Sequence, residues 1–208
     1  MAKLYFEHGA MGAQKTANLL IAAYDYEKTG RIPLLTKPSA DTKGDNRLVS
    51  RVGLEREVDF VTTPDLDVEK KVMVRREKAR ELNKDINVLL VDEAQFLQPE
   101  QVDQLFNLAV MRAIPVLAYG LRTDFQTHGF PGSRRLLEIA HVIRESITMC
   151  NDSDGCSRRG IFNARLQNEE FVSEGDQIAI DGEGDISYAA LCGEHYIEHV
   201  GPIRAKQD

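Results

Sequence analysis

The chain has 208 residues, enough for one ordinary domain or for a domain with a small appendage, and enough to bury a sizeable core. Its 33 acidic and 26 basic side chains give a formal net charge of -7 at pH 7, which argues against a nucleic acid polymer as partner because such proteins need a basic surface. The opening residues have too short an apolar stretch for a signal peptide and no later stretch is long enough to cross a bilayer, so we expect a cytoplasmic protein with no membrane partner.

The first predicted elements are a strand at residues 3–6, a loop at residues 8–16 and a helix that stops near Gly30. The loop reads His8-Gly9-Ala10-Met11-Gly12-Ala13-Gln14-Lys15-Thr16. It resembles the phosphate-binding pattern G-x-x-x-x-G-K-[ST], except that Gln14 replaces the second glycine. In such loops backbone N–H groups surround the phosphates, the lysine neutralises their charge and the hydroxyl holds magnesium. We therefore expect residues 9–16 to bind the phosphates of ATP, with Thr16 also on Mg²⁺; the alternative is a chance strand-to-helix turn.

The next predicted elements continue an alternation of strands and helices. Apolar runs at 32–36, 87–91 and 114–119 predict strands, and helices are expected near 68–83, from Pro99 onward, and over roughly 133–141. The runs lack the apolar and polar alternation of a half-exposed strand, which is typical of a parallel sheet covered on both faces. The expected fold is therefore α/β, a P-loop NTPase-like parallel sheet flanked by helices, with ligands at the carboxyl ends of its strands.

Two carboxylates, Asp92 and Glu93, end the apolar run at 88–91. In a phosphate-loop protein, an acid at this position coordinates magnesium directly or through water, and a neighbouring acid takes a proton from the attacking group. Asp92 is therefore the expected magnesium ligand and Glu93 the expected catalytic base. The alternative is that both acids merely begin the turn before the helix at Pro99.

The last third of the chain is rich in turn residues, and we place a domain boundary near residue 147. Residues 1–146 are expected to form the nucleotide-binding domain, and residues 147–208 a small domain with short strands at 161–166 and 177–180. A small domain with little hydrophobic core needs an additional stabilising link, and in a reducing compartment that link is a bound metal rather than a disulfide.

Cys150, Cys156, Cys192 and His195 supply the thiols and the imidazole of a closed tetrahedral zinc site. The Cys192 and His195 pair is the stronger half, because the gap between Cys150 and Cys156 exceeds the usual spacing of about two to four residues. Two alternatives stay open. The cysteines are free and buried without metal, or another residue takes the place of Cys150, namely Asp152, Asp154 or His199.

Aromatic side chains gather in the segments expected to overhang the site: Phe96, Phe125, Phe130 and Tyr188. Flat ligands such as nucleobases are held by aromatic faces and apolar walls, so the group favours a nucleobase pocket. Taken singly, each of these residues is also an ordinary core residue.

The order of these motifs resembles that of the type II thymidine kinase family over nearly the whole chain. The segments that carry the resemblance are Ala10-Met11-Gly12-Ala13-Gln14-Lys15-Thr16, Lys37-Pro38-Ser39-Ala40-Asp41-Thr42-Lys43, Ser50-Arg51-Val52-Gly53-Leu54, Val91-Asp92-Glu93-Ala94-Gln95-Phe96, Tyr119-Gly120-Leu121-Arg122-Thr123-Asp124-Phe125, Gly175-Asp176-Gln177-Ile178, and Tyr188 before Cys192 and His195. The segments 92–96 and 120–125 are specific when they occur together.

The resemblance implies transfer of the ATP γ-phosphate to the 5′-hydroxyl of thymidine or deoxyuridine, a salvage reaction that gives the monophosphate. It implies that Glu93 deprotonates the hydroxyl and that Lys15, Thr16, Asp92 and Lys43 manage phosphate and magnesium. It also implies a small zinc domain with a lasso-like loop, whose main chain near 177–181 reads the base edge. The implied walls of the nucleoside pocket are Met11, Phe96, Leu121, Phe125, Phe130, Ile178, Ala179 and Tyr188. Family members are commonly homotetramers inhibited by thymidine triphosphate, and the same is expected here.

Three features depart from the family pattern: Gln14 in the loop, the long gap between Cys150 and Cys156, and Lys43 where members often carry arginine. A lysine keeps the charge of arginine but loses its bidentate fork. The alternative to an active kinase is therefore a non-catalytic nucleoside or nucleotide sensor whose phosphate loop Gln14 has disabled. A third possibility is an ATPase coupled to mechanical work, although the chain shows neither a basic track nor an evident arginine-finger motif.

Overall fold

The computed structural model describes residues 1–152, 156–177 and 185–205. Its larger part is a six-stranded sheet of order β5-β2-β6-β7-β1-β8, and all of its strand pairs are parallel. The strands are β1 (Leu4–His8), β2 (Ile32–Pro38), β5 (Phe60–Thr62), β6 (Ile86–Val91), β7 (Val116–Gly120) and β8 (Val142–Glu145).

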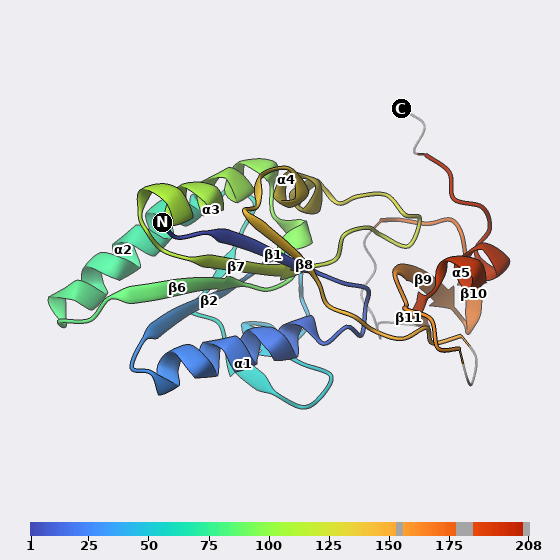
Figure 1. The fold of residues 1–208 in the computed structure, drawn as a ribbon, viewed down its shortest axis with the longest axis horizontal. Helices are drawn as coiled ribbons and strands as arrows, with labels where there is room; N and C mark the ends of the chain where they lie inside the picture. The colour runs from blue at the N-terminus through green and yellow to red at the C-terminus, as the bar shows by residue number, and fades with distance from the viewer. Residues whose placement is uncertain (153–155, 178–184, 206–208) are drawn as a thin grey trace.

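Helices cover both faces of this sheet (Figure 1). Helix α1 (Lys15–Lys28) lies on one face, and α2 (Val68–Glu81), α3 (Pro99–Met111) and α4 (Pro131–Ile139) lie on the other. The predicted α/β fold with a parallel sheet flanked by helices is confirmed.

The two-sided cover explains why the central strands are apolar at successive positions. Leu35 of β2 packs with the α1 side of the core, whereas the preceding Leu34 packs with the α2 and α3 side. In β6, Leu90 likewise packs on the α1 side and Leu89 on the α2 and α3 side. Since successive side chains of a strand point to opposite faces, both faces of these strands are buried.

The edge strands β5 and β8 were not predicted from the sequence. Each is short, and three of the four residues of β8 are exposed, so neither shows the apolar run that identified the central strands. Helix α3 begins at Pro99 as expected, with a capping box between Gln98 and Gln101. Helix α4 begins at Pro131, two residues before the expected start.

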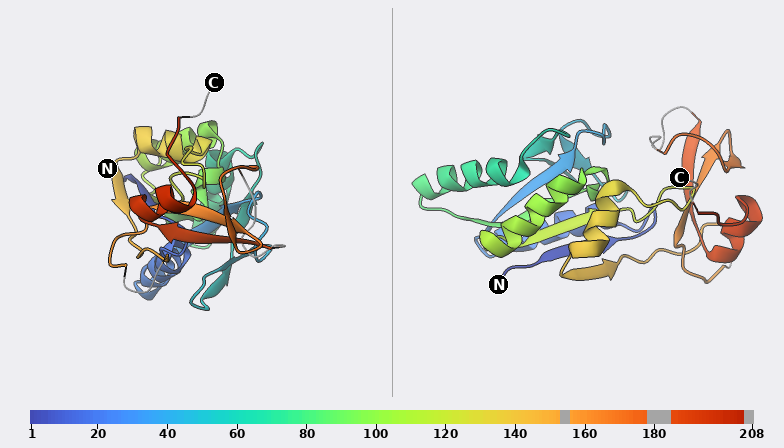
Figure 2. Two further views of the ribbon diagram at one scale, coloured as in Figure 1. Left: turned by 90° about the vertical axis from the view of Figure 1, so that its right-hand side faces the viewer. Right: turned by 90° about the horizontal axis from the view of Figure 1, so that it is seen from above.

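A second, smaller sheet lies at one end of the first (Figure 2). It is antiparallel, of order β10-β9-β11, with strands β9 (Phe162–Gln167), β10 (Glu170–Val172) and β11 (Ile186–Leu191), and helix α5 (Gly193–His199) follows it. The expected strand at 161–166 corresponds to β9. Of the expected strand at 177–180, only Gln177 is described, and it lies in a bend. The domain boundary near residue 147 stays a prediction.

A hairpin and a short helix complete the description. Strands β3 (Arg47–Val49) and β4 (Glu55–Glu57) pair antiparallel after β2, and the 3-10 helix η1 (Ala94–Phe96) follows β6. Neither was predicted. Within the described ranges, no helix has the length and apolar character needed to cross a membrane.

The loop at 121–130, between β7 and α4, joins the two sheets. Asn163 of β9 donates from Nδ2 to the carbonyl of Thr123 at 2.9 Å, and the Tyr196 hydroxyl of α5 donates to the carbonyl of Phe125 at 2.5 Å. Gln177 donates from Nε2 to Asp124 Oδ2 at 2.8 Å. The small sheet therefore lies over the carboxyl ends of β1, β6 and β7, where a parallel sheet binds its ligands.

Candidate active site

The phosphate loop joins the end of β1 to the start of α1. Gly9 has to be glycine, because a Cβ atom there would lie 2.4 Å from the carbonyl oxygen of Ser146. The Lys15 side chain is buried and its Nζ donates to the carbonyls of Gly9 and Ala10, each at 3.0 Å. Burial lowers the pKa of Lys15, while the charges of Glu93 and Asp92 oppose that shift. The loop therefore holds its cation within reach of an anion at the helix N-terminus.

Gln14 adopts the backbone conformation that its position requires. Its φ and ψ angles are 57° and 22°, in the left-handed region that glycine enters most easily. A side chain in that region costs roughly 1 kcal/mol, but the course of the loop is kept, and the Gln14 side chain is exposed at the cavity.

Asp92 and Glu93 follow β6 and face the start of α1. The buried Asp92 carboxylate accepts a hydrogen bond from the Thr16 hydroxyl. Burial and the neighbouring Glu93 charge raise the pKa of Asp92 to about 7. Oxygen atoms are the ligands that Mg²⁺ prefers, so Thr16 and Asp92 form a fitting donor set for it.

Glu93 has a strained backbone, with a φ angle of 47° and a ψ angle of 38°. Strained conformations of this kind gather at functional sites. Gln95, two residues further on, donates from its side chain to the Glu93 carboxylate.

One cavity brings most of the predicted site residues together. With its open mouth it spans ≈ 1290 Å³ of empty space. The predicted residues that line it are Met11, Gly12, Gln14, Lys15, Thr16, Lys43, Asp92, Glu93, Phe96, Leu121, Phe125, Phe130 and Tyr188.

Three predicted residues of the phosphate loop are not part of this lining. Gly9, Ala10 and Ala13 are buried in the loop beneath it. Ile178 and Ala179, together with the rest of the expected lasso segment after Gln177, lie outside the described residues.

The wall of the cavity away from the phosphate loop is aromatic. Phe96 and Phe130 meet edge to face with centroids 5.6 Å apart. The buried Arg165 lies over the Phe125 ring, with its Cζ 3.8 Å from the centroid, and donates from Nε to the Tyr188 hydroxyl at 2.9 Å. Such a wall suits a flat, uncharged ring.

Sequence reasoning missed three polar residues at this site. Asn163 accepts the backbone N–H of Met11 at 2.8 Å and so ties the phosphate loop to β9. Gln95 and Arg165 were not assigned a role either. Gln95 stands in the specific segment at 92–96 but was given no role of its own, whereas Asn163 and Arg165 gave no signal beyond a polar residue within a strand segment.

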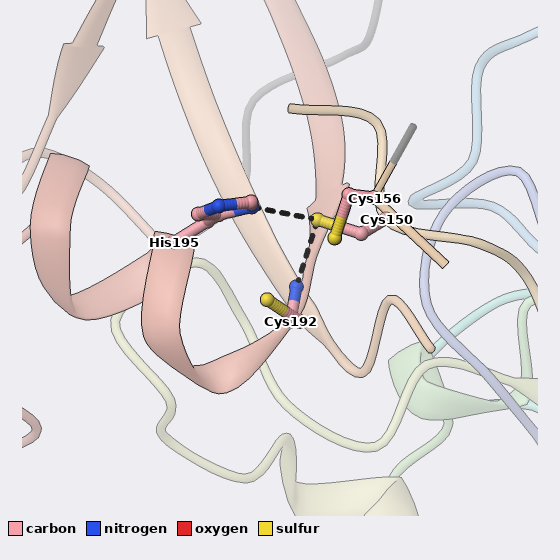
Figure 3. Close-up of side chains that lie close together, drawn as sticks. All are labelled: Cys150, Cys156, Cys192 and His195. Carbon is pink, nitrogen blue, oxygen red and sulfur yellow. Dashed lines mark hydrogen bonds between the residues drawn. The ribbon is translucent and has the colours of Figure 1, made fainter. Parts of the chain in front are cut away.

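The predicted zinc ligands lie together beside the small sheet (Figure 3). The donor atoms of Cys150, Cys156, Cys192 and His195 all lie within 4.8 Å of one another. Cys150 belongs to the cluster, so no other residue is needed in its place.

Hydrogen bonds and burial act on the cysteine thiols of this cluster. The N–H of Cys192 donates to Cys150 Sγ at 3.2 Å, and His195 Nδ1 lies 3.3 Å from the same sulfur. A hydrogen bond from the His195 backbone lowers the pKa of the Cys192 thiol, whereas burial raises the pKa of Cys150. Asp152 contacts His195 and His199 beside the cluster, and Asp154 lies outside the described residues.

Comparisons with known proteins agree with this geometry. A family model described as thymidine kinase matches residues 2–196. A thymidine kinase of Enterobacteria phage T4 is 42% identical over 200 residues, which cover 95% of this chain and 97% of that protein. Thymidine kinases of Mesorhizobium japonicum and Agrobacterium fabrum are 40% and 39% identical, over 97% and 95% of this chain and 94% and 97% of their own.

Proposed function

The chain belongs to the thymidine kinase family, and from that premise we propose that it is an ATP-dependent nucleoside kinase that phosphorylates thymidine at the 5′-hydroxyl. The observation that carries the proposal is the layout of the cavity. Lys15, Thr16 and Asp92 lie at its phosphate end, Phe125 and Tyr188 belong to its aromatic wall, and Glu93 opens onto the same space.

In the proposed reaction, the 5′-hydroxyl oxygen attacks the γ-phosphorus of ATP and the bond to the β,γ-bridging oxygen breaks, so that ADP leaves. The hydroxyl proton passes to the Glu93 carboxylate, which acts as general base. Lys15 and the loop N–H groups stabilise the charge that spreads over the phosphate oxygens. Magnesium, held through the oxygens of Thr16 and Asp92, supplies further charge neutralisation.

Two metals are therefore part of the proposal. Magnesium fits the hard oxygen donors of Thr16 and Asp92, and zinc fits the cluster of Cys150, Cys156, Cys192 and His195, whose donor atoms converge. The zinc has a structural role, because the thiols and the imidazole fill its tetrahedral shell and leave no open position for a substrate.

No observation among the described residues favours the sensor alternative. The left-handed conformation of Gln14 keeps the course of the phosphate loop, and Lys15 and Glu93 are both in place. An ATPase coupled to mechanical work would consume ATP without a nucleoside.

The decisive experiment is steady-state release of ADP from Mg-ATP with and without thymidine. Turnover in the natural protein is expected to depend on thymidine. The Glu93→Gln variant is expected to lose about 100-fold or more in kcat, because general base catalysis contributes on that order. Thymidine-independent turnover would support the ATPase, and thymidine binding without turnover would support the sensor. Full activity in Glu93→Gln would remove the assignment of the base.

Family membership also supports four finer proposals. The protein accepts deoxyuridine as a second substrate, assembles as a homotetramer, is inhibited by thymidine triphosphate and works in the cytoplasm. Met11, Phe96, Leu121, Phe125, Phe130 and Tyr188 wall the thymine pocket in this proposal, with Ile178 and Ala179 contributing from the lasso, and Lys43 contacts the phosphates.

A further inference from the structure

Gln95 has no part in the reaction described so far, yet its side chain donates a hydrogen bond to the proposed base. We propose that Gln95 is a positioning residue, which fixes the Glu93 carboxylate in the orientation that accepts the 5′-hydroxyl proton. The inference rests on the proposed kinase function and adds a residue that acts through Glu93.

The Gln95 side chain is buried and uses both ends of its amide. The residue is 1% exposed. Its Nε2 donates to Glu93 Oε2 at 2.5 Å, and its Oε1 accepts the backbone N–H of Leu121 at 3.0 Å. One side chain thus connects the carboxylate of the base to the backbone at the end of β7.

The contact with Leu121 decides which way the amide faces. A backbone N–H only donates, so the amide atom next to it has to be the oxygen. The amide nitrogen therefore points to Glu93, and an ionised carboxylate is the acceptor that suits it. A flipped amide would set two donors against each other at Leu121 and two acceptors against each other at Glu93.

Gly120 leaves the room that this arrangement needs. A Cβ atom on Gly120 would lie 2.6 Å from Gln95 Oε1 and 3.1 Å from the Gln95 backbone nitrogen. Its φ angle is outside the left-handed region, so the requirement for glycine is one of space for the Gln95 amide.

Glu93 needs such support because a glutamate side chain turns about three bonds. Gln95 fixes one carboxylate oxygen, and in this proposal the other oxygen accepts the proton. Displacement of a reacting group by about 1 Å can lower a rate by about 100-fold. The bond from Gln95 therefore acts on kcat, whereas the cavity walls that bind the nucleoside are left in place.

The test compares the natural protein with Gln95→Met, which keeps the length of the side chain and removes the amide. We expect kcat to fall by about 10-fold to 100-fold, with KM for thymidine within about threefold of its natural value. In the Glu93→Gln background the same substitution is expected to cause no further loss, because its effect passes through the carboxylate.

A matched control is Gln101→Met. Gln101 is also a buried glutamine, and its amide donates to the carbonyls of Thr63 at 2.8 Å and Leu66 at 3.0 Å, away from the cavity. The Gln101→Met variant is expected to lower the thermal midpoint and leave kcat unchanged.

If Gln95→Met does not fold, Gln95→Glu replaces it in the test. This variant keeps the volume and a polar end but cannot donate to Glu93 when ionised, and the same fall in kcat is expected.

A kcat within twofold of the natural value in a folded Gln95 variant overturns the positioning role and leaves the kinase function intact. Losses that multiply in the double variant with Glu93→Gln also overturn it, because Gln95 would then act independently of the base. An inactive natural protein overturns the proposed function itself, and this inference with it.

Discussion

Gln14 shows how a phosphate loop can keep its shape with a side chain where the motif has glycine. The loop requires a left-handed backbone at this residue, and Gln14 adopts it at a φ angle of 57°. The cost is local strain and a side chain at the cavity wall. Strain and crowding are separate effects, so different substitutions can distinguish them.

Gln14→Gly is expected to stabilise the fold by up to about 1 kcal/mol, because glycine enters the left-handed region without strain. It is also expected to lower KM for ATP. Thermal unfolding and steady-state kinetics measure the two effects. Gln14→Ala is the matched control, since it keeps the strained Cβ and removes the long side chain. An equal gain in stability in both variants would show that strain is not the cause.

At the scale of elements, the cysteine cluster joins two segments that are distant in the sequence and that also share backbone hydrogen bonds, such as that of Asn151 N–H to the carbonyl of Ala190. Cys150 and Cys156 come from the segment before β9, whereas Cys192 caps the N-terminus of α5 and His195 lies in the first turn of that helix. The local apolar core is small and consists largely of these same cysteines with Ala164, Leu191 and Tyr196. A metal at the cluster would therefore supply much of the stability of the small sheet.

Removal of zinc is expected to lower the thermal midpoint by about 5 °C or more, because a structural zinc contributes directly to the folding free energy. Elemental analysis of the purified protein should give one zinc per chain, and Cys192→Ser should lose it. Return of zinc to the chelated natural protein should restore the midpoint. A protein that contains no zinc after growth in zinc-supplied medium would favour free cysteines.

At the scale of the whole molecule, the cavity depends on how the two sheets are joined. Asn163 is buried on β9 and bonds both the Met11 backbone of the phosphate loop and the Thr123 carbonyl of the loop after β7. Asn163 therefore bonds both the phosphate loop and the loop that carries Phe125 of the aromatic wall. Asn163 acts beside Tyr196 and Gln177, which bond to the same loop after β7.

Asn163→Ala is expected to lower kcat/KM for thymidine by about tenfold or more, because loss of a buried hydrogen-bond partner costs about 1–3 kcal/mol. Both the nucleoside and ATP should be affected, since the variant loosens both ends of the cavity. Gln167→Ala, at an exposed position of the same strand, serves as the control. If kcat/KM is the same in Asn163→Ala and Gln167→Ala, Asn163 does not hold the two sheets in their relative position.

The sequence was sufficient to predict the central strands, the phosphate loop and the acidic pair Asp92-Glu93. Each of these depends on a local pattern of residues. Runs such as Leu34-Leu35 and Leu89-Leu90 are apolar at successive positions, and this marks a strand buried on both faces. The hairpin β3-β4 was missed because its residues are mostly polar and exposed. Asn163 was missed because its partner Met11 is 152 residues away, and no local pattern encodes that contact.

The hydrogen bonds of Lys15 bear on which anions compete for the loop inside a cell. Two of the three N–H donors of its ammonium group bond to the carbonyls of Gly9 and Ala10, so the third can meet an incoming anion without breaking either bond. Free orthophosphate gains that bond and the attraction of the charge. A triphosphate chain can also engage loop N–H groups and brings its own metal, so it gains more than orthophosphate at the same lysine. The two carbonyls thus hold the lysine in place before the anion arrives, and the choice between anions falls to the rest of the loop.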